Sequence, residues 1–203
     1  CINKWLMKTF LHVGCGPIKK TLVKGFSNDE WSEIRLDIDE KVRPDIIGSI
    51  LDMHSVKSGS VDAVYSSHNI EHVFPHEVPI ALKEFHRVLK DNGIVVLTCP
   101  DLQRVCEAVV NDKLTEPLYE TPGGHKICPI DSLYGWRGPI ASGNHFMAHK
   151  TGFTYSVLNN EFLKAGFKMN YGGQVQAWNL FIVSFKQSLS EKEIKKVADP
   201  FFP

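Results

Sequence analysis

No charge of either sign dominates this sequence: its 203 residues contain 23 lysines and arginines and 23 aspartates and glutamates. Because no excess of positive charge attracts polyanions, we expect neither a nucleic acid nor a membrane surface as a partner. Hydrophobic runs are short, and none approaches the roughly 18 apolar residues of a membrane-spanning helix. No signal peptide is recognisable. The chain begins at Cys1 rather than at methionine, and we expect a few residues to precede it.

Cysteine is scarce and its spacing forms no pattern. No two cysteines make a C-x-x-C pair, and the five stand at Cys1, Cys15, Cys99, Cys106 and Cys128. A disulfide framework or a zinc knuckle is therefore not expected. We interpret Cys15 and Cys99 as small buried residues near strand ends. Reduced thiols are typical of the cytoplasm, which is the predicted location.

The composition is that of a globular protein, with 43% hydrophobic and 23% charged residues, and the length fits a single domain over residues 1–203. Strands and helices are expected to alternate: strands at 8–13, 33–37, 45–48, 61–66 and 93–98, and helices at 76–90, from 102 onward and at 154–165. Asn92-Gly93 is expected to close the helix 76–90. Two final apolar runs, 167–176 and 178–185, predict an antiparallel hairpin. Together these elements predict an α/β fold with a doubly wound, mostly parallel sheet of seven strands that ends in this hairpin.

The segment 114–150 interrupts the alternation. It is rich in proline and glycine and carries several aromatic residues and histidines. Irregular segments of this length inside a compact domain are usually functional. We therefore predict that 114–150 is an insertion that covers the substrate as a lid. The last residues, 189–203, have the composition of a charged tail.

A turn with two glycines follows the first expected strand. Gly14 and Gly16 lie in this turn, and Asp37 ends the second expected strand. Such glycines let the backbone approach a ligand closely, and an acid at the end of the next strand can accept hydrogen bonds from ribose hydroxyls. Lys19 stands where a dinucleotide fingerprint needs a small residue, and Pro17 removes a backbone N–H that a pyrophosphate would use. The pattern favours a nucleoside ligand without phosphate and disfavours an NAD oxidoreductase.

Several segments together resemble the class I S-adenosylmethionine-dependent methyltransferases, in particular the type 11 group. The resemblance is carried by Gly14-Cys15-Gly16-Pro17, the strand that ends at Asp37, Leu51-Asp52-Met53, the run from Val61 to His68, Glu71-His72, and the run from Ala81 to Lys90 with Asn92-Gly93. It implies a Rossmann-like fold, S-adenosyl-L-methionine as the cofactor and S-adenosyl-L-homocysteine as the product.

The same resemblance implies the residues that bind the cofactor. Asp37 would bind the ribose hydroxyls, Ile38 would lie against the adenine face, and Asp52 would accept from the adenine amino group. The N–H of Met53 would meet the ring, and the backbone at Ser66 would meet the methionine ammonium group. The complete expected set is Gly14, Cys15, Gly16, Pro17, Asp37, Ile38, Asp52, Met53, Ser66 and Ser67.

Two positions depart from the pattern of this family. His12 stands where an acid often precedes the first glycine, and Ile18 stands where a third glycine is often found. These departures, with the lack of an unambiguous catalytic base, leave open an alternative: a noncatalytic adenosylmethionine-binding protein of the same fold. Cofactor binding without detectable methyl transfer would support this alternative.

The residues from His68 to His72 spell H-x-x-E-H, a motif that in the inverted zinc peptidases places two histidine ligands on one helix face with the glutamate as base. Here the motif directly follows an expected buried strand, and Pro75 stops any helix shortly after it. No downstream acid stands out as a third ligand. A zinc peptidase is therefore the less favoured alternative, and no metal is expected. For His72 we expect a place at the mouth of the pocket, in contact with the substrate.

A methyl group on a sulfonium is already activated, so the enzyme must mainly align it and exclude water. A hydroxyl acceptor also needs a base near neutral pH, and histidine suits this role. The candidate bases are His68, His145 and His149. The candidate substrate-binding residues are His72, Tyr134, Trp136 and Arg137, through aromatic faces or an anion contact. The predicted function is methyl transfer to a small-molecule or glycan acceptor.

Overall fold

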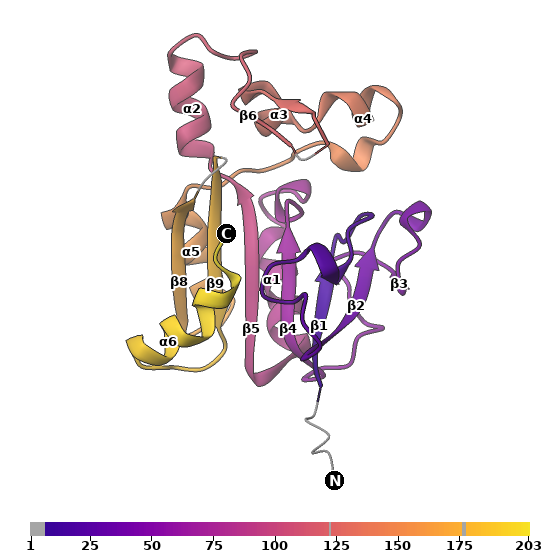
Figure 1. Cartoon of the computed structure of the whole chain (residues 1–203), viewed down its shortest axis with the longest axis vertical. Helices are drawn as coiled ribbons and strands as arrows, with labels where there is room; N and C mark the ends of the chain where they lie inside the picture. Colours follow the sequence, from indigo (N-terminus) through magenta and orange to yellow (C-terminus); the bar gives the residue numbers. More distant parts are fainter. Residues whose placement is uncertain (1–6, 122, 176–177) are drawn as a thin grey trace.

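The computed structural model describes residues 7–121, 123–175 and 178–203; Cys1 and residue 176 of one expected strand lie outside them. A seven-stranded sheet forms the centre, in the order β3-β2-β1-β4-β5-β9-β8 (Figure 1). Its strands are β1 (Lys8–Val13), β2 (Trp31–Asp37), β3 (Ile46–Ile47), β4 (Val61–Ser67), β5 (Leu89–Pro100), β8 (Met169–Val175) and β9 (Asn179–Phe185). The strands β1 to β5 are parallel, and β9 pairs antiparallel with both β5 and β8. The predicted parallel sheet with its terminal hairpin is confirmed.

Helices flank the sheet and also stand above one of its ends. They are α1 (Val78–Val88), α2 (Leu102–Val110), α3 (Pro129–Tyr134), α4 (Arg137–Ala141), α5 (Tyr155–Lys164) and α6 (Glu191–Ala198). Single helical turns lie at Lys20–Leu22, Glu40–Val42, Ile70–His72, His145–Met147 and Asp199–Phe201, and a separate small hairpin joins β6 (Tyr119–Glu120) to β7 (Lys126–Ile127). Within the described part of the chain, no helix combines the length and apolar character needed to cross a membrane.

Helix α1 ends at Val88, and the Asn92-Gly93 pair that was expected to close it lies inside β5. Leu89 already has extended backbone angles and is fully buried. The N–H groups of Gly59 and Ser60 donate to the last carbonyl oxygens of the helix, at 2.9 Å each. Because these carbonyls already have partners, the chain passes from helix to strand without a glycine cap.

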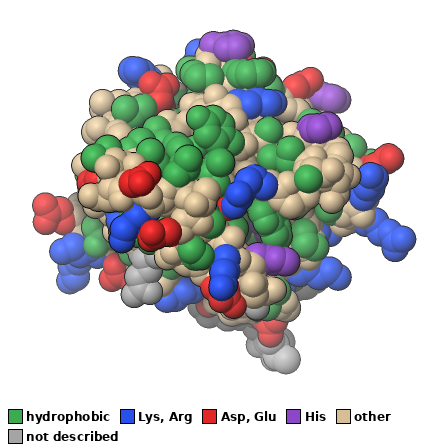
Figure 2. All heavy atoms as spheres, turned by 90° about the horizontal axis from the view of Figure 1, so that it is seen from above, with side chains coloured by type: hydrophobic (Ala, Val, Ile, Leu, Met, Phe, Trp, Pro, Cys, Tyr) green, Lys and Arg blue, Asp and Glu red, His purple; other side chains and the backbone are tan. Residues whose placement is uncertain are grey.

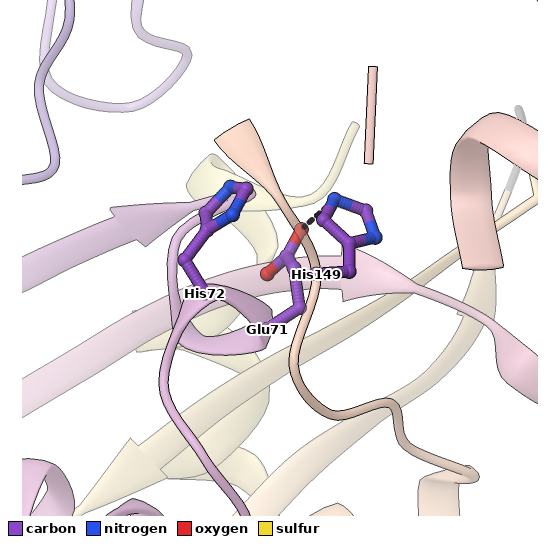
Figure 3. Close-up of side chains that lie close together, drawn as sticks. All are labelled: Glu71, His72 and His149. Atoms are coloured by element: carbon purple, nitrogen blue, oxygen red, sulfur yellow. Dashed lines mark ion pairs between the residues drawn. The ribbon is translucent and has the colours of Figure 1, made fainter. Parts of the chain in front are cut away.

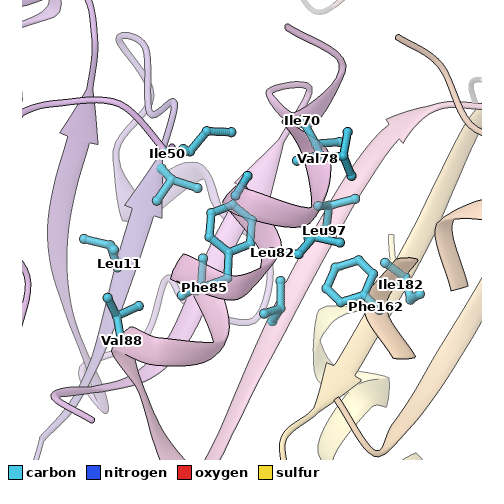
Figure 4. Packing of buried hydrophobic residues seen from close by; sticks show 14 of the residues in the cluster. Leu11, Ile50, Ile70, Val78, Leu82, Phe85, Val88, Leu97, Phe162 and Ile182 are labelled. Atoms are coloured by element: carbon cyan, nitrogen blue, oxygen red, sulfur yellow. The ribbon is translucent and has the colours of Figure 1, made fainter. Parts of the chain in front are cut away.

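One face of the sheet is covered by α1 and α5 (Figure 4). The inward positions of α1 recur at spacings of three and four residues, and all are buried: Val78, Ala81, Leu82, Phe85 and Val88. They form one cluster with buried side chains of β1, β4, β5 and α5. Truncating a fully buried phenylalanine such as Phe85 to alanine costs about 3–5 kcal/mol. The spacing of apolar residues in the sequence therefore predicts correctly which side of this helix is buried in the main core.

The opposite face is covered by the C-terminal segment rather than by crossover helices. Between β1 and β2, and between β2 and β3, the chain forms only single helical turns. In their place α6 and the turn after it bury Ile194 and Phe201 against a cluster that contains Phe26 and other side chains of this face. The expectation of a charged tail at 189–203 is wrong, because the few apolar residues there are spaced to form one buried helix face.

The segment 114–150 folds into short elements that stand, with α2, above the carboxyl ends of the parallel strands (Figure 1). We call residues 101–150 the cap. At its start the N–H of Asp101 donates to the carbonyl oxygen of Trp178, next to β9, at 2.8 Å, and its carboxylate caps α2 by accepting from the N–H of Gln103 at 3.2 Å. At its end the N–H of Lys150 donates to the carbonyl oxygen of Glu71 at 2.8 Å. The cap is thus tied at its start to Trp178 beside β9 and at its end to the turn after β4.

Candidate functional site

The turn after β1 is held in one conformation by its neighbours. Gly14 and Gly16 both have left-handed φ angles, +58° and +50°. A Cβ atom on Gly14 would collide with the side chain of Asn69, so only glycine fits there. The N–H of Gly16 donates to Oδ2 of Asp37 at 2.8 Å, and the Arg35 guanidinium donates to the carbonyl oxygen of Gly16. These contacts place the glycine turn at the carboxyl ends of β1 and β2.

Asp37 ends β2 beside this turn, and only 8% of the residue is exposed. Its Oδ2 accepts from Gly16, and its Oδ1 accepts from the N–H of Asp39 at 2.9 Å. Each carboxylate oxygen has two lone pairs, so both keep capacity for a further donor. The next side chain, Ile38, is 49% exposed. A largely buried acid with spare acceptor capacity, followed by an exposed apolar residue, fits the ribose and base of a nucleoside.

His12 stands where the family often has an acid, and its side chain contacts an acid on the neighbouring strand instead. Its Nδ1 lies 2.8 Å from Oε1 of Glu33 on the neighbouring strand. The other carboxylate oxygen of Glu33 accepts from the N–H of Lys20, at 3.0 Å. Burial lowers the pKa of His12, although Glu33 acts in the opposite direction. The acid that binds the helical turn at Lys20–Leu22 is therefore Glu33 of β2, and β1 has no acid at the position of His12.

The turn that carries Asp52 is fixed by an ion pair of α1. The carboxylate of Asp52 is exposed and lies 3.2 Å from Nδ1 of His54. Met53 is fully buried, and its N–H donates to Oε2 of Glu84 at 2.7 Å. Arg87 holds the same carboxylate through two hydrogen bonds (2.6 and 2.8 Å) and donates to the Met53 carbonyl at 2.8 Å. In this structure the N–H that was expected to meet adenine is therefore engaged by Glu84.

The end of β4 lies directly beside the glycine turn. Ser66 pairs in register with Val13, the last residue of β1, and its side chain is fully buried. The hydroxyl of Ser67 lies 2.9 Å from that of Thr98 on β5. Both serines are thus placed at the strand ends where a cofactor would pass from β1 to β4, and neither side chain projects freely from the protein.

Cys15 and Cys99 are buried free thiols, as predicted. Burial raises the pKa of the Cys15 thiol to about 11. The pKa of Cys99 is raised well above its usual value for the same reason. Neither thiol is poised to act as a nucleophile.

A cluster of histidines around one carboxylate lies where β4 meets the cap (Figure 3). His68 follows β4 directly and has a left-handed φ of +49°, which is uncommon for a residue with a side chain. The next helical turn carries Glu71 and His72, and the end of the cap contributes His149. Oε1 of Glu71 lies 3.4 Å from Nδ1 of His68 and 4.0 Å from Nε2 of His149. The motif seen in the sequence is therefore completed by a residue far along the chain.

Glu71 is the electrostatic centre of the cluster. The residue is 1% exposed, and neither carboxylate oxygen accepts a hydrogen bond from the described protein. Burial alone would raise its pKa, but the neighbouring His68 and the charges of His72 and His149 outweigh burial and hold the pKa below its usual value. Burial lowers the pKa of His149. These shifts favour an ionised carboxylate next to a neutral imidazole.

A cavity of about 350 Å³ opens onto this cluster between the strand ends and the cap. Its walls include His68, His72, Tyr119, Trp136 and His149. A second cavity of about 280 Å³ lies next to it, against Glu71. Figure 2 looks down on this end of the molecule, where hydrophobic side chains gather in the middle and most charged side chains lie toward the edge. The site is thus an aromatic and histidine-lined cavity beside a buried carboxylate.

The other residues singled out in the sequence lie in different positions. His145 is exposed on a helical turn of the cap and stands outside both cavities. Tyr134 is 67% exposed and lines the smaller cavity. Arg137 is bound to Asp131 through two hydrogen bonds (2.6 and 3.1 Å), which occupy two of the five N–H donors of its guanidinium. Sequence reasoning missed Tyr119, which belongs to a two-residue strand with no recognisable motif.

One family model and several solved structures are similar to this chain. The family model of the type 11 methyltransferase domain matches residues 11–97. No curated protein sequence matches the chain. An S-adenosylmethionine-dependent methyltransferase of Methanosarcina mazei is similar in structure, with a TM-score of 0.60 and 16% identity over 93% of this chain and 97% of that one. A protein of Pyrococcus horikoshii OT3 gives a TM-score of 0.60 with 13% identity, covering 88% and 82% of the two chains.

A third similar structure contains ligands. It is the 1,6-didemethyltoxoflavin-N1-methyltransferase of Burkholderia thailandensis with bound 1,6-didemethyltoxoflavin and S-adenosylhomocysteine. Its TM-score is 0.54, with 13% identity over 89% of this chain and 71% of that one. At such identities the likeness establishes the fold, and the match at 11–97 is the evidence for the family.

Proposed function

Because this chain is a class I S-adenosylmethionine-dependent methyltransferase of the type 11 group, we propose that it methylates a small-molecule or glycan acceptor bound between β4 and the cap. The observation that carries the proposal is the position of the cavity of about 350 Å³. His68 lines that cavity, and the next residue, Asn69, packs against Gly14 of the glycine turn. The proposed cofactor and acceptor sites therefore meet at the end of β4.

The residues at the glycine turn fit the cofactor. Gly14 and Gly16 let the backbone approach it closely, Asp37 accepts from the ribose hydroxyls, and Ile38 contacts the adenine face. The exposed carboxylate of Asp52 accepts from the adenine amino group. The ends of β1 and β4 receive the methionine part. When bound, S-adenosylmethionine supplies a methyl group that is already activated by its sulfonium.

On the acceptor side, we assign His68 as the base that takes the proton of a hydroxyl acceptor. Its imidazole is 39% exposed, belongs to the cavity wall and lies next to the carboxylate of Glu71, which orients the ring. His72, Trp136 and His149 form the walls that orient the acceptor. His145 has no part in this proposal, because it stands outside the cavity.

The cap excludes water from the reaction and acts as the lid. Its contribution is supported by the two elements that it adds to the cavity, the short strand with Tyr119 and the helix region with Trp136. A volume of about 350 Å³ is at the lower end of the range for small-molecule sites and fits one ring or one sugar unit. The free thiols of the described cysteines support a reducing compartment such as the cytoplasm.

The test is methyl transfer from labelled S-adenosylmethionine to a panel of small hydroxylated acceptors and monosaccharides. We expect His68→Ala to lower the transfer rate by about 10²–10⁴, the usual contribution of a general base. The matched control His145→Ala should keep the full rate. Equal rates in the wild type and His68→Ala would overturn the assignment of the base. Tight cofactor binding without transfer to any acceptor would favour the noncatalytic alternative.

A further inference from the structure

Three side chains at the end of β4 are arranged like the ligands of a metal ion. One ring nitrogen of His72, one of His149 and one carboxylate oxygen of Glu71 all lie within 4.8 Å of one another (Figure 3). Glu71 is buried and the two histidines are partly buried. The sequence alone predicts no metal, because no downstream acid stands out as a third ligand. In the structure the third ligand is a histidine from the cap.

The hydrogen bonds of both histidines fix which ring nitrogen carries the proton. Nδ1 of His72 lies 3.1 Å from the carbonyl oxygen of Ala148, and Nδ1 of His149 lies 2.8 Å from that of Ser132. A carbonyl oxygen can only accept, so each Nδ1 must donate a proton. In the neutral ring the lone pair then stands on Nε2. This second contact, from the far nitrogen to a backbone carbonyl, is the one that metal-binding histidines usually make.

The ionisable side chains that face the carboxylate at the centre are histidines. Neither oxygen of Glu71 accepts a hydrogen bond, and no lysine or arginine of the described ranges forms an ion pair with it. Nε2 of His149 lies 4.0 Å from Oε1 of Glu71, so the lone pair of the neutral imidazole faces the negative carboxylate. A buried carboxylate without a hydrogen bond is costly, and a cation between these atoms would supply the missing partner.

We propose that Glu71, His72 and His149 bind one divalent transition-metal ion in the wall of the acceptor cavity. Two imidazoles and one carboxylate are the ligand set of open zinc sites, which keep a further position for water or substrate. Nitrogen donors disfavour Mg²⁺ and Ca²⁺, which prefer oxygen ligands. Ligand atoms around a tetrahedral Zn²⁺ lie about 3.3 Å apart. Binding therefore draws the end of the cap toward β4 by about an ångström.

The open position gives the ion a role that rests on the proposed function. A hydroxyl oxygen of the acceptor coordinates the ion, which lowers the pKa of that hydroxyl. The proton passes to His68, whose Nδ1 lies 3.4 Å from Oε1 of Glu71 and which is not needed as a ligand. The resulting oxyanion forms the new C–O bond while the bond from methyl to sulfur breaks, and the sulfonium leaves as the neutral thioether. The acceptor class is thus a hydroxyl compound able to coordinate a metal.

The test is a calorimetric titration of the EDTA-treated 203-residue chain with Zn²⁺. Co²⁺ serves as a second probe, because its visible absorption reports its coordination. We expect one ion per chain and a Co²⁺ spectrum typical of four or five ligands. His72→Ala and His149→Ala should each weaken Zn²⁺ binding by at least about tenfold. The matched control is His145→Ala, which removes an exposed histidine from the same part of the cap and should leave the affinity unchanged.

The outcomes separate the metal site from the proposed function. Absence of stoichiometric binding, or equal loss in His145→Ala and His149→Ala, overturns the site. Full methyl transfer in the EDTA-treated protein overturns its role in acceptor binding. Binding of S-adenosylhomocysteine is measured in parallel on the same variants to confirm that they fold. A wild-type protein that binds Zn²⁺ but not S-adenosylhomocysteine would contradict the proposed function and leave the metal site standing.

Discussion

Asp37 has two roles in this account: it stabilises the glycine turn, and it is proposed to bind the ribose of the cofactor. Its carboxylate accepts one backbone hydrogen bond from Gly16 at 2.8 Å and one from Asp39 at 2.9 Å. A hydrogen bond to a charged group contributes about 1.5–3 kcal/mol. Replacement by alanine removes both, and water that enters the space restores part of the loss. We expect Asp37→Ala to lower the free energy of unfolding by about 2–4 kcal/mol, measured by urea denaturation.

The same substitution tests the ribose contact. Loss of two charge-assisted hydrogen bonds to the ribose hydroxyls costs about 2–4 kcal/mol of binding free energy, which corresponds to a dissociation constant raised about 30- to 1,000-fold. Calorimetric titration with S-adenosylhomocysteine measures the change. The assay is made at a temperature where circular dichroism shows the variant to be folded.

A neighbouring acid provides the matched control. Asp39 carries the same charge, and among the described residues its carboxylate accepts only from the N–H of Lys41, at 3.0 Å. Asp39→Ala should therefore change the affinity for S-adenosylhomocysteine by less than about threefold. An unchanged affinity in folded Asp37→Ala would refute the assignment of the ribose site, and an equal loss in both variants would attribute the effect to charge alone.

Three further predictions concern parts of the fold that support the site. Arg87→Ala removes two hydrogen bonds to Glu84, and we expect it to lower both the free energy of unfolding, by about 2–3 kcal/mol, and the affinity for S-adenosylhomocysteine, whereas the exposed Lys83→Ala on the same helix should change neither. Burial lowers the pKa of His12 below its ordinary 6.5, so the unfolded chain takes up a proton that the folded protein resists; the free energy of unfolding should fall as the pH drops below about 6.5, and a His12→Gln variant with the same slope would contradict this. Removal of 191–203 should expose the second face of the sheet and cause binding of a hydrophobic dye; a truncated protein that binds no dye and is equally stable would show that α6 is dispensable.

The elements that the sequence predicts well are those whose signal is local. β1 is found at its predicted bounds, because an apolar run ends at the glycine turn. The buried face of α1 follows directly from the spacing of its apolar residues. The end of α1 is different: Asn92-Gly93 has the chemistry of a turn, but the pairing of Leu89 with Val61 in the sheet decides where the helix stops. Tertiary contacts override a local preference there.

The parts of the site that the sequence could not supply depend on contacts between distant segments. The motif at His68 to His72 is visible in the sequence, but the position of His149 beside it follows from the path of the cap. Arg137 has the chemistry of an anion-binding residue, yet Asp131 engages it on the same short stretch of chain. The role of α6 is hidden for a similar reason, because a mostly charged helix with a few apolar residues shows its purpose only against an uncovered sheet face.

The central claim is that the edge formed by the glycine turn and Asp37 binds S-adenosylmethionine. Its most direct test is calorimetric titration of the wild-type chain with S-adenosylhomocysteine, with NADH titrated in parallel. The account predicts one molecule of S-adenosylhomocysteine bound per chain with micromolar affinity, about −8 kcal/mol, and no heat with NADH. No binding of S-adenosylhomocysteine by the folded protein, or tighter binding of NADH, would contradict it.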